Sequence, residues 1–354
     1  MPHNLLLDTL GLYGVRGIVR EVFATYLEGR GQIPKVNGKF SDLSTVKMGR
    51  PQGTVLGPLL FIMYIKTLTD MELLSGQVVS YADDTAIVFH GSSWENVKRT
   101  SEIGLSKVKD WLDTYKLTMN VDKTHYIAFS LNHSCRPDFN VLNIHNYNMN
   151  IYEVHTIKYL GVVLDRFLRW DEHIARLNKN IRKLIYKFYI LRSILKRKLL
   201  IVVYGAIVES LLRYALVVWG GVYNNSLRQL KVTQNYIVKV IYKKNRTYPT
   251  DLIYTSEILR IRTLYITCLC TYTHKHLNLK KHINHIYNTR SRRNHNLCTP
   301  LCRTTHFQKS LEYQIPKFYN LLPASLRKIE NIKRFSLLSR NFIIENENKF
   351  LAFI

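Results

Sequence analysis

The sequence predicts an α+β fold in the first half of the chain and a mainly helical fold in the second half. In the first half, segments with helical spacing of apolar residues alternate with short runs of β-branched and aromatic residues. From Trp170 to Tyr242 the spacing becomes helical throughout, and basic residues become frequent. A chain of 354 residues is long enough for two or three domains. We expect three parts, residues 1–165, 166–245 and 246–354, the last of which mixes short helices with His, Asn and Arg clusters.

The first predicted elements are two helices and a short hairpin. Apolar residues recur at helical spacing from Asn4 to Leu27, and a glycine-containing turn at residues 14–17 interrupts them. The sequence Val36-Asn37-Gly38-Lys39 indicates a hairpin, because Asn-Gly favours a tight turn. Residues 59–68 are mostly apolar, so we expect a helix that is buried on most of its sides.

A second hairpin is predicted between residues 78 and 89. Val78 to Ser80 and Thr85 to Phe89 are runs of strand-forming residues on either side of a polar turn. One apolar stripe over residues 93–117 predicts an amphipathic helix, with Ser92 or Ser93 as its N-cap. A further strand is expected at Tyr126–Phe129, followed by two strands near Ile151 and Tyr159 that pair with each other.

The charge of the chain lies almost entirely in its second half. Net charge is +26; residues 1–165 hold 16 basic and 16 acidic side chains, and residues 166–354 hold 35 basic and 9 acidic ones. A surface this basic indicates a polyanionic partner, with nucleic acid ahead of an anionic membrane, although biased codon usage is an alternative source of lysine. The apolar stretch from Leu199 to Val222 contains Glu209 and Arg213, so it predicts a buried helix and no membrane partner.

The cysteines indicate a reducing compartment. There are five, an odd number without the spacing of a disulfide framework. The N-terminal residues show no targeting signal. A zinc site remains an alternative use for two of the cysteines, but nearby arginines oppose a cation. The residues concerned are His295, Cys298, Cys302 and His306, with Arg292, Arg293 and Arg303 close by.

The strongest chemical signal is Tyr81-Ala82-Asp83-Asp84, the polar turn of the second hairpin. Two adjacent carboxylates at a tight turn are forced close together, and such a pair favours cation binding. Phosphoryl transfer uses two Mg²⁺ ions roughly 4 Å apart, and Mg²⁺ prefers carboxylate oxygen. An Asp-Asp turn is also common on ordinary protein surfaces, because Asp favours turn geometry.

A glycine- and proline-rich segment, Gly49 to Pro58, precedes this turn in the sequence. Glycine and proline fix a backbone path that a bulky side chain would block. A loop bearing Gln52 at the start of a buried helix suits contact with a base pair and its sugar. An ordinary turn before a helix is the alternative, but the order of the two segments favours a functional site.

Four segments, taken in order, resemble motifs of the reverse transcriptases of non-LTR (LINE-type, jockey-like) retrotransposons. They are Gly49–Phe61, Tyr81–Asp84, Asn120–Thr124 and Lys158–Asp165. Two later segments are similar to the Y…S…Y…WG region and to the P-x-x-W/Y-N-x-L-P tail of the same family. They are Tyr204–Gly220 and Pro316–Pro323.

The resemblance implies roles for individual residues. Asp83 would be a metal ligand and Asp84 its supporting neighbour, while Tyr81 would border the primer end. Lys123 would approach the triphosphate, although it is also placed to cap a helix or to pair with Asp122. The remaining implied contacts are with template, primer and nucleotide: Gly49, Pro51, Gln52, Gly53, Tyr159, Leu160 and Gly161. Gly161 is alternatively a simple strand bulge.

The resemblance also implies an architecture and partners. Residues 1–165 would form part of a right-hand polymerase palm, an antiparallel sheet with helices, and residues 166–245 a helical thumb that contacts phosphates. The partners would be an RNA template, a DNA primer and dNTPs, with Mg²⁺ as cofactor. Copying RNA at chromosomal DNA would place the protein in the nucleus.

One departure from the family bears on activity. The first catalytic aspartate of the family lies in an A-F-D-x-V-x-H-x-x-L-type motif, and His3 to Leu7 is similar to the downstream end of that motif. We therefore expect a chain truncated at its N-terminus and inactive alone, because a two-metal site takes carboxylates from both motifs. The alternative function is a non-catalytic nucleic-acid-binding remnant of a retroelement.

Overall fold

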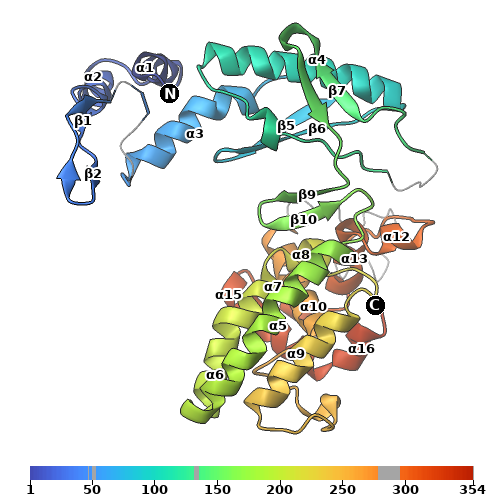
Figure 1. Ribbon diagram of the computed structural model, residues 1–354. Helices are drawn as coiled ribbons and strands as arrows, with labels where there is room; N and C mark the ends of the chain where they lie inside the picture. The colour runs from blue at the N-terminus through green and yellow to red at the C-terminus, as the bar shows by residue number, and fades with distance from the viewer. Residues whose placement is uncertain (47, 50–52, 131–134, 278–295, 354) are drawn as a thin grey trace. The chain divides into compact units, whose positions relative to one another are not determined.

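The computed structural model describes residues 1–46, 48–49, 53–130, 135–277 and 296–353. The chain divides into two compact units, Met1–Leu160 and Gly161–Ile354 (Figure 1). The first unit combines helices with small antiparallel sheets, and the second is mainly helical, so the α+β fold expected from the sequence is present. The two helices and the Asn37-Gly38 hairpin predicted near the N-terminus are also confirmed.

Three helices and two short strand pairs form the beginning of the first unit. Leu6, Leu10, Leu27 and Leu60 are fully or almost fully buried among these helices. In the β2–β3 hairpin, Asn37 and Gly38 have φ values of 50° and 82°, the two positive angles of a tight hairpin turn. The elements are α1 (His3–Leu12), α2 (Ile18–Leu27), β1 (Gly31–Gln32), β2 (Lys35–Val36), β3 (Lys39–Phe40), β4 (Ser44–Thr45) and α3 (Leu56–Thr69).

Helix α3 is buried on one side only, so the expectation of a helix buried on most sides is wrong. Leu60, Tyr64 and Leu68 pack against α1 and β5, with the Tyr64 hydroxyl donating to the Tyr115 carbonyl oxygen at 2.5 Å. Leu59 and Ile62 are more than half exposed. An apolar helix sequence does not specify how many neighbours the helix has, and here its neighbours cover a single face.

The second half of the first unit packs one long helix against two hairpins. In Figure 1, α4 (Trp94–Thr114) runs along the hairpin of β5 (Gly76–Tyr81) and β6 (Asp84–Phe89) and along β7 (Val141–Ile144). The Ser93 hydroxyl oxygen accepts a hydrogen bond from the Asn96 amide at 3.2 Å, so Ser93 is the N-cap of this helix.

The strand pairing after α4 differs from the prediction in two places. β7 pairs with β8 (Met149–Tyr152), and β9 (Thr156–Tyr159) is not the partner of β8. Residues 126–129 do not form a strand; Tyr126 makes an isolated bridge to Glu153. Strand-forming residue types indicate an extended backbone, but pairing partners depend on which segments meet in the folded unit.

The second unit is built around helices that share one core. α5, α6 and α9 lie side by side in Figure 1, and Phe188, Tyr204 and Ile237 are buried among them. Among the described residues, no helix combines the length and apolar character that a membrane crossing requires. The elements up to residue 241 are β10 (Val162–Asp165), α5 (Asp171–Ile194), α6 (Arg197–Tyr204), the π-helix η3 (Gly205–Glu209), α7 (Ser210–Arg213), α8 (Leu216–Trp219) and α9 (Arg228–Ile241).

The C-terminal helices belong to the same core. Leu264, Tyr265, Phe318 and Phe335 are buried with the residues of α5 and α9 in one apolar cluster. The boundary between the two units falls at residue 160, and the expected division of the second unit at residue 245 stays a prediction. The elements are α10 (Ile261–Lys275), α12 (Thr305–Gln308), α13 (Leu311–Tyr319), α14 (Ala324–Arg327), α15 (Ile332–Glu345) and α16 (Glu347–Leu351).

Candidate functional site

The acidic pair lies at the tip of the β5–β6 hairpin. Tyr81 pairs with Asp84, so the turn consists of Ala82 and Asp83 alone, and Ala82 has a positive φ of 52°. Both carboxylate-bearing residues are exposed, as is Tyr81, at 67%. A two-residue turn leaves Asp83 and Asp84 no neighbours to bury them, and their oxygens remain open to ligands.

The two faces of this hairpin have different surroundings. Cross-strand partners share a face, so Val78 and Ile87 lie on one face and Tyr81 and Asp84 on the other. Val78 and Ile87 belong to the apolar cluster that also contains Val108 and Trp111 of α4. Because α4 packs on the first face, the face that carries Asp84 and Tyr81 is open.

The carboxylates fit a hard cation in chemistry and in exposure, but they are only two. Asp83 and Asp84 offer oxygen ligands, which Mg²⁺ prefers. Within the described ranges, no group of three or more His, Cys, Asp or Glu side chains gathers where it would hold a metal ion. A metal at this turn would therefore take further ligands from outside the pair.

The glycine-rich segment is described only in part. Gly49 and Gly53 have positive φ values of 89° and 76°, which a residue with a Cβ rarely adopts, while Pro51 and Gln52 lie outside the described residues. The Gly49 amide donates to the Met1 carbonyl oxygen at 2.7 Å. The His3 Nε2 atom lies 3.0 Å from the Gly49 carbonyl oxygen, so His3 holds the start of this segment.

The contact of His3 with Gly49 was not predicted from the sequence. The sequence indicates His3 only as part of a motif, and the contact joins residues 46 positions apart. A distance of this kind leaves no local pattern in a single sequence. The fold brings the two residues together, because Pro2 forms an isolated antiparallel bridge with Met48.

Lys123 lies in a separate exposed turn, the 3₁₀ helix η1 (Val121–Lys123). Asn120 caps this turn, because its side-chain oxygen accepts from the Lys123 amide at 3.2 Å. In the part of the chain that the structure describes, no ion pair joins Lys123 to Asp83 or Asp84. The structure holds the Lys123 backbone in place and leaves its ammonium group exposed.

Tyr159, Leu160 and Gly161 form a tight turn at the boundary between the units. Leu160 and Gly161 have φ values of 44° and 81°, and a Cβ on Gly161 would lie 3.3 Å from the Tyr214 ring. Glycine is therefore favoured at residue 161 both by the backbone angle and by the available space.

Asp165, at the end of the same motif, has a structural role that the sequence did not indicate. Its carboxylate accepts hydrogen bonds from the backbone amides of Phe167, Arg169 and Trp170, at 3.1, 3.0 and 2.7 Å. Charged acceptors stabilise such loops more than neutral ones do. Asp165 thus orders the loop that leads into α5.

A basic recess lies on α5 in the second unit. Its volume is about 430 Å³, and Ala175, Asn178, Lys179, Arg182 and Lys183 line it. The Asn178 side-chain oxygen accepts a hydrogen bond from the Thr233 hydroxyl at 2.6 Å, which joins α5 to α9. Three cationic side chains on adjacent turns of one helix suit contact with successive phosphates.

The alternative zinc site is described only in part, because His295 lies outside the described residues. The His306 Nε2 atom is 3.1 Å from the Phe167 carbonyl oxygen. The imidazole is therefore engaged in joining α12 to the loop before α5.

Comparison with known proteins shows what the first unit is similar to. Residues 1–164 match the family described as reverse transcriptase (RNA-dependent DNA polymerase). The chain is similar to a probable RNA-directed DNA polymerase from transposon X-element of Drosophila melanogaster, at 24% identity over 64% of this chain and 26% of the relative.

Two further relatives have the same extent of similarity. The RNA-directed DNA polymerase from mobile element jockey of Drosophila funebris is 25% identical over 66% of this chain and 26% of its own length. A probable RNA-directed DNA polymerase from transposon BS of Drosophila melanogaster is 25% identical over 65% of this chain and 27% of its own length. The chain thus spans about a quarter of each of these curated relatives.

Proposed function

We propose that this chain, whose residues 1–164 match the reverse transcriptase family, is the RNA-directed DNA polymerase region of a non-LTR retrotransposon protein. The reaction is the addition of a dNTP to the 3′ end of a DNA primer on an RNA template. The observation that carries the proposal is the acidic pair Asp83–Asp84 on the open face of a hairpin whose other face packs on α4.

Asp83 and Asp84 would hold Mg²⁺ at this turn, with Asp83 as the ligand and Asp84 in support. The bound cations, two in this class of reaction, supply charge neutralisation at the attacking hydroxyl and at the triphosphate. The chain's own contribution is to hold two carboxylates in an exposed turn that is fixed by strand pairing. Preorganised charge of this kind lowers the barrier without reorganisation during the reaction.

The other site residues would bind and orient the substrates. Tyr81 lies on the same face as Asp84 and would border the primer end. Lys123 would attract the triphosphate, since its ammonium group is exposed. The backbone of Gly49, Pro51, Gln52 and Gly53 would contact the templating base pair, and Tyr159, Leu160 and Gly161 would grip the primer.

The proposed layout follows the expected parts of the chain. Residues 1–165 would be the palm and residues 166–245 the thumb, with the basic recess on α5 against the phosphates of the template-primer. Copying RNA next to chromosomal DNA would put the protein in the nucleus. The role of residues 246–354 in this layout is to complete the core of the second unit.

We expect little polymerisation by the chain alone. A two-metal site takes carboxylates from two separate motifs, and the described residues bring together only the pair at this turn. Loss of one ligand group from such a site removes several kcal/mol of transition-state stabilisation, on the order of 2.7–4 kcal/mol for one charge-stabilising donor.

The test is primer extension on an RNA template with four dNTPs, beside Mn²⁺ binding in the presence of the same template-primer. Any extension should be weak, should need Mg²⁺ and should stop on addition of EDTA. Asp83→Asn should abolish it and weaken Mn²⁺ binding by roughly tenfold, which corresponds to about 1.4 kcal/mol. Asp138→Asn is the matched control, because Asp138 is also exposed and lies outside the turn.

Three results would contradict the proposal. Efficient extension that Asp83→Asn leaves unchanged would remove the turn from the active site. Equal Mn²⁺ binding by the wild type and Asp83→Asn would show that this turn holds no metal ion. Failure to bind an RNA–DNA template-primer at all would remove the polymerase function itself.

The alternative function is a non-catalytic nucleic-acid-binding protein, for which the basic recess on α5 would suffice, because contact with phosphates needs no metal site. If the chain has this function, its affinity for template-primer should fall steeply as salt rises. The wild type and Asp83→Asn should then bind Mn²⁺ equally. The same two assays therefore separate the two functions.

A further inference from the structure

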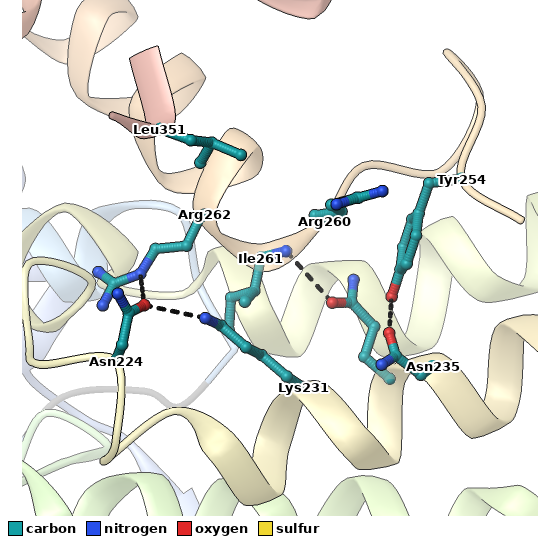
Figure 2. A pocket seen from close by; sticks show the side chains of 9 residues that line it. Asn224, Lys231, Asn235, Tyr254, Arg260, Ile261, Arg262 and Leu351 are labelled. Carbon is teal, nitrogen blue, oxygen red and sulfur yellow. Dashed lines mark hydrogen bonds between the residues drawn. The ribbon is translucent and has the colours of Figure 1, made fainter. Parts of the chain in front are cut away.

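A second recess in the helical unit lies between α9 and the beginning of α10, far in sequence from the acidic turn. Its volume is about 280 Å³. Figure 2 shows Lys231 and Arg262 converging on Asn224 at one end and Tyr254 beside Asn235 at the other. The cationic residues that line it are Lys231, Arg260 and Arg262.

Arg262 carries a buried charge that no carboxylate neutralises. The residue is 4% exposed, and its guanidinium donates to the carbonyl oxygens of Gly220 and Val222 and to the Asn224 side-chain oxygen. All three acceptors are neutral. Burial lowers the pKa of Arg262 to about 10, which reflects the cost of keeping this charge away from water.

Lys231 adds a second cation to the same acceptor. Its ammonium group donates to the Asn224 side-chain oxygen at 2.9 Å, and the Arg262 Nε donates to that oxygen at 3.3 Å. Burial and the charge of Arg262 lower the pKa of Lys231. Burial, Arg262 and Lys317 lower the pKa of Lys309. Like charges gathered around a neutral oxygen repel one another unless an anion joins them.

Two carboxylates leave Lys231 and Arg262 without a counter-charge. Asp251 neutralises the third cation of the recess, because it forms an ion pair with Arg260 at 2.9 Å, and Glu347 accepts a hydrogen bond from the Thr263 hydroxyl. Within the described residues, no ion pair joins a carboxylate to Lys231 or Arg262.

The beginning of α10 forms a further part of the recess. The helix starts at Ile261 with no acidic residue in its first turn, and the Ile261 amide donates to the neutral side-chain oxygen of Gln234 at 3.2 Å. The Arg260 Nε is buried without a hydrogen-bond partner, and the central carbon of the Arg260 guanidinium lies 5.2 Å from the centre of the Tyr254 ring. Donors and positive charge thus exceed acceptors around the recess.

We propose that this recess binds a phosphate group, carried by a nucleotide or by the end of a nucleic-acid strand, between Lys231 and Arg262. A phosphate supplies the negative charge and the acceptor oxygens that the cluster lacks. A recess of this size holds a phosphate with part of its nucleoside rather than a large cofactor, since pockets for larger ligands begin at about 300 Å³. The site is independent of the acidic turn and of the proposed polymerase function.

A purely structural role would account for Arg262 alone. Its bonds to Gly220, Val222 and Asn224 tie the loop after α8 to α10, which is a sufficient reason for a buried arginine. It does not account for Lys231 beside it. The two roles predict different effects for a negative charge placed at residue 224.

Asn224→Asp separates the two roles. The new carboxylate would pair with Lys231 and Arg262, so the melting temperature should equal or exceed that of the wild type. The same carboxylate would occupy the place of the anion and repel it, so phosphate affinity should fall by roughly tenfold or more. Lys231→Met should also weaken binding, while Lys239→Met, on the same helix but outside the recess, should not.

Binding is measured with the full chain by calorimetry, using inorganic phosphate, deoxyadenosine monophosphate, deoxyadenosine, and one short RNA with and without a 5′-phosphate. The expected result is binding of the phosphate-bearing probes and none of deoxyadenosine. Tighter binding of the monophosphate than of the RNA identifies a free nucleotide as the source, and the reverse order identifies a strand end.

Three results would overturn the proposal. One is the absence of binding by every phosphate-bearing probe. Another is equal affinity of the wild type, Asn224→Asp and Lys231→Met. The third is equal binding of the RNA with and without its 5′-phosphate together with no binding of the monophosphate, which would show general attraction to a basic surface.

Discussion

At the scale of single residues, His274 shows how the fold selects one chemical form of a side chain. Its Nε2 lies 2.6 Å from the Ile329 carbonyl oxygen, which only accepts, so Nε2 carries the proton and donates. Nδ1 then accepts from the Tyr319 hydroxyl at 2.9 Å, and the ring stacks on Phe335. The neutral imidazole satisfies both contacts; a second proton, on Nδ1, would make Nδ1 a donor, and the Tyr319 hydroxyl would have to reverse from donor to acceptor.

This arrangement predicts acid sensitivity of the second unit. Burial lowers the pKa of His274 and, with Arg176, that of His173, whose Nδ1 accepts from the Val163 amide at 3.4 Å. The unfolded chain therefore binds more protons than the folded one at mildly acidic pH. Stability should be full above the ordinary histidine pKa of about 6.5 and should fall as pH decreases through and below that value.

The measurement is the melting temperature between pH 7.5 and pH 5. His274→Gln should flatten the pH dependence in part, because His173 remains, and should lower stability at neutral pH. His276→Gln, at the end of the same helix, is the control. A pH dependence that is identical in His274→Gln and the wild type would exclude this explanation.

At the scale of elements, Asn320 shows which parts of the fold the tail motif at residues 316–323 joins. Its side-chain oxygen accepts from the Leu297 amide at 2.9 Å, and its nitrogen donates to the Leu297 carbonyl oxygen at 3.0 Å. Together with the contact of Tyr319 with His274, this joins α13 to α10 and to residue 297. The motif closes the core of the second unit.

The cap of α4 gives a prediction at the same scale. Ser93→Ala removes the acceptor for the Asn96 amide and should reduce the free energy of unfolding by about 1 kcal/mol. Ser93→Asp keeps an acceptor and adds a negative charge at the positive end of the helix, so its stability should match the wild type. Urea unfolding followed by tryptophan fluorescence, with Trp111 on α4, measures both. Equal loss in both variants would argue against the cap.

At the scale of the whole molecule, each unit has its own core. The largest apolar cluster, which includes Phe188, Trp219, Tyr265 and Phe335, lies wholly within residues 161–354. Residues 166–354 also hold the entire excess of positive charge. Folding and attraction to nucleic acid should therefore both be properties of the second unit by itself.

We expect a fragment of residues 161–354 to fold alone, with a helical circular dichroism spectrum and a cooperative thermal transition. Its affinity for RNA should fall steeply as salt rises, because bound phosphates release counterions. Lys179→Glu and Arg182→Glu together should reduce the salt dependence, since both side chains line the recess on α5. A fragment that does not fold, or a fragment whose affinity for RNA does not change with salt concentration, would contradict this division of roles.

Much of the first unit could be predicted from local patterns. The Asn37-Gly38 turn, the hairpin around Asp83 and the helix capped by Ser93 follow from turn and capping preferences that act within a few residues. The pairing of β7 with β8 and the one-sided burial of α3 did not follow, because they depend on which distant segments become neighbours.

The sequence by itself determined the resemblance to reverse transcriptases, the charge asymmetry and the exposed acidic pair, since each depends on residue identity and on short-range geometry. Only the tertiary structure decided that His3 holds Gly49, that Asp165 orders the loop before α5, and that Lys231 and Arg262 share the Asn224 oxygen. These contacts join segments that the fold brings together. Burial strengthens the electrostatic interactions of their charges, which composition alone does not indicate.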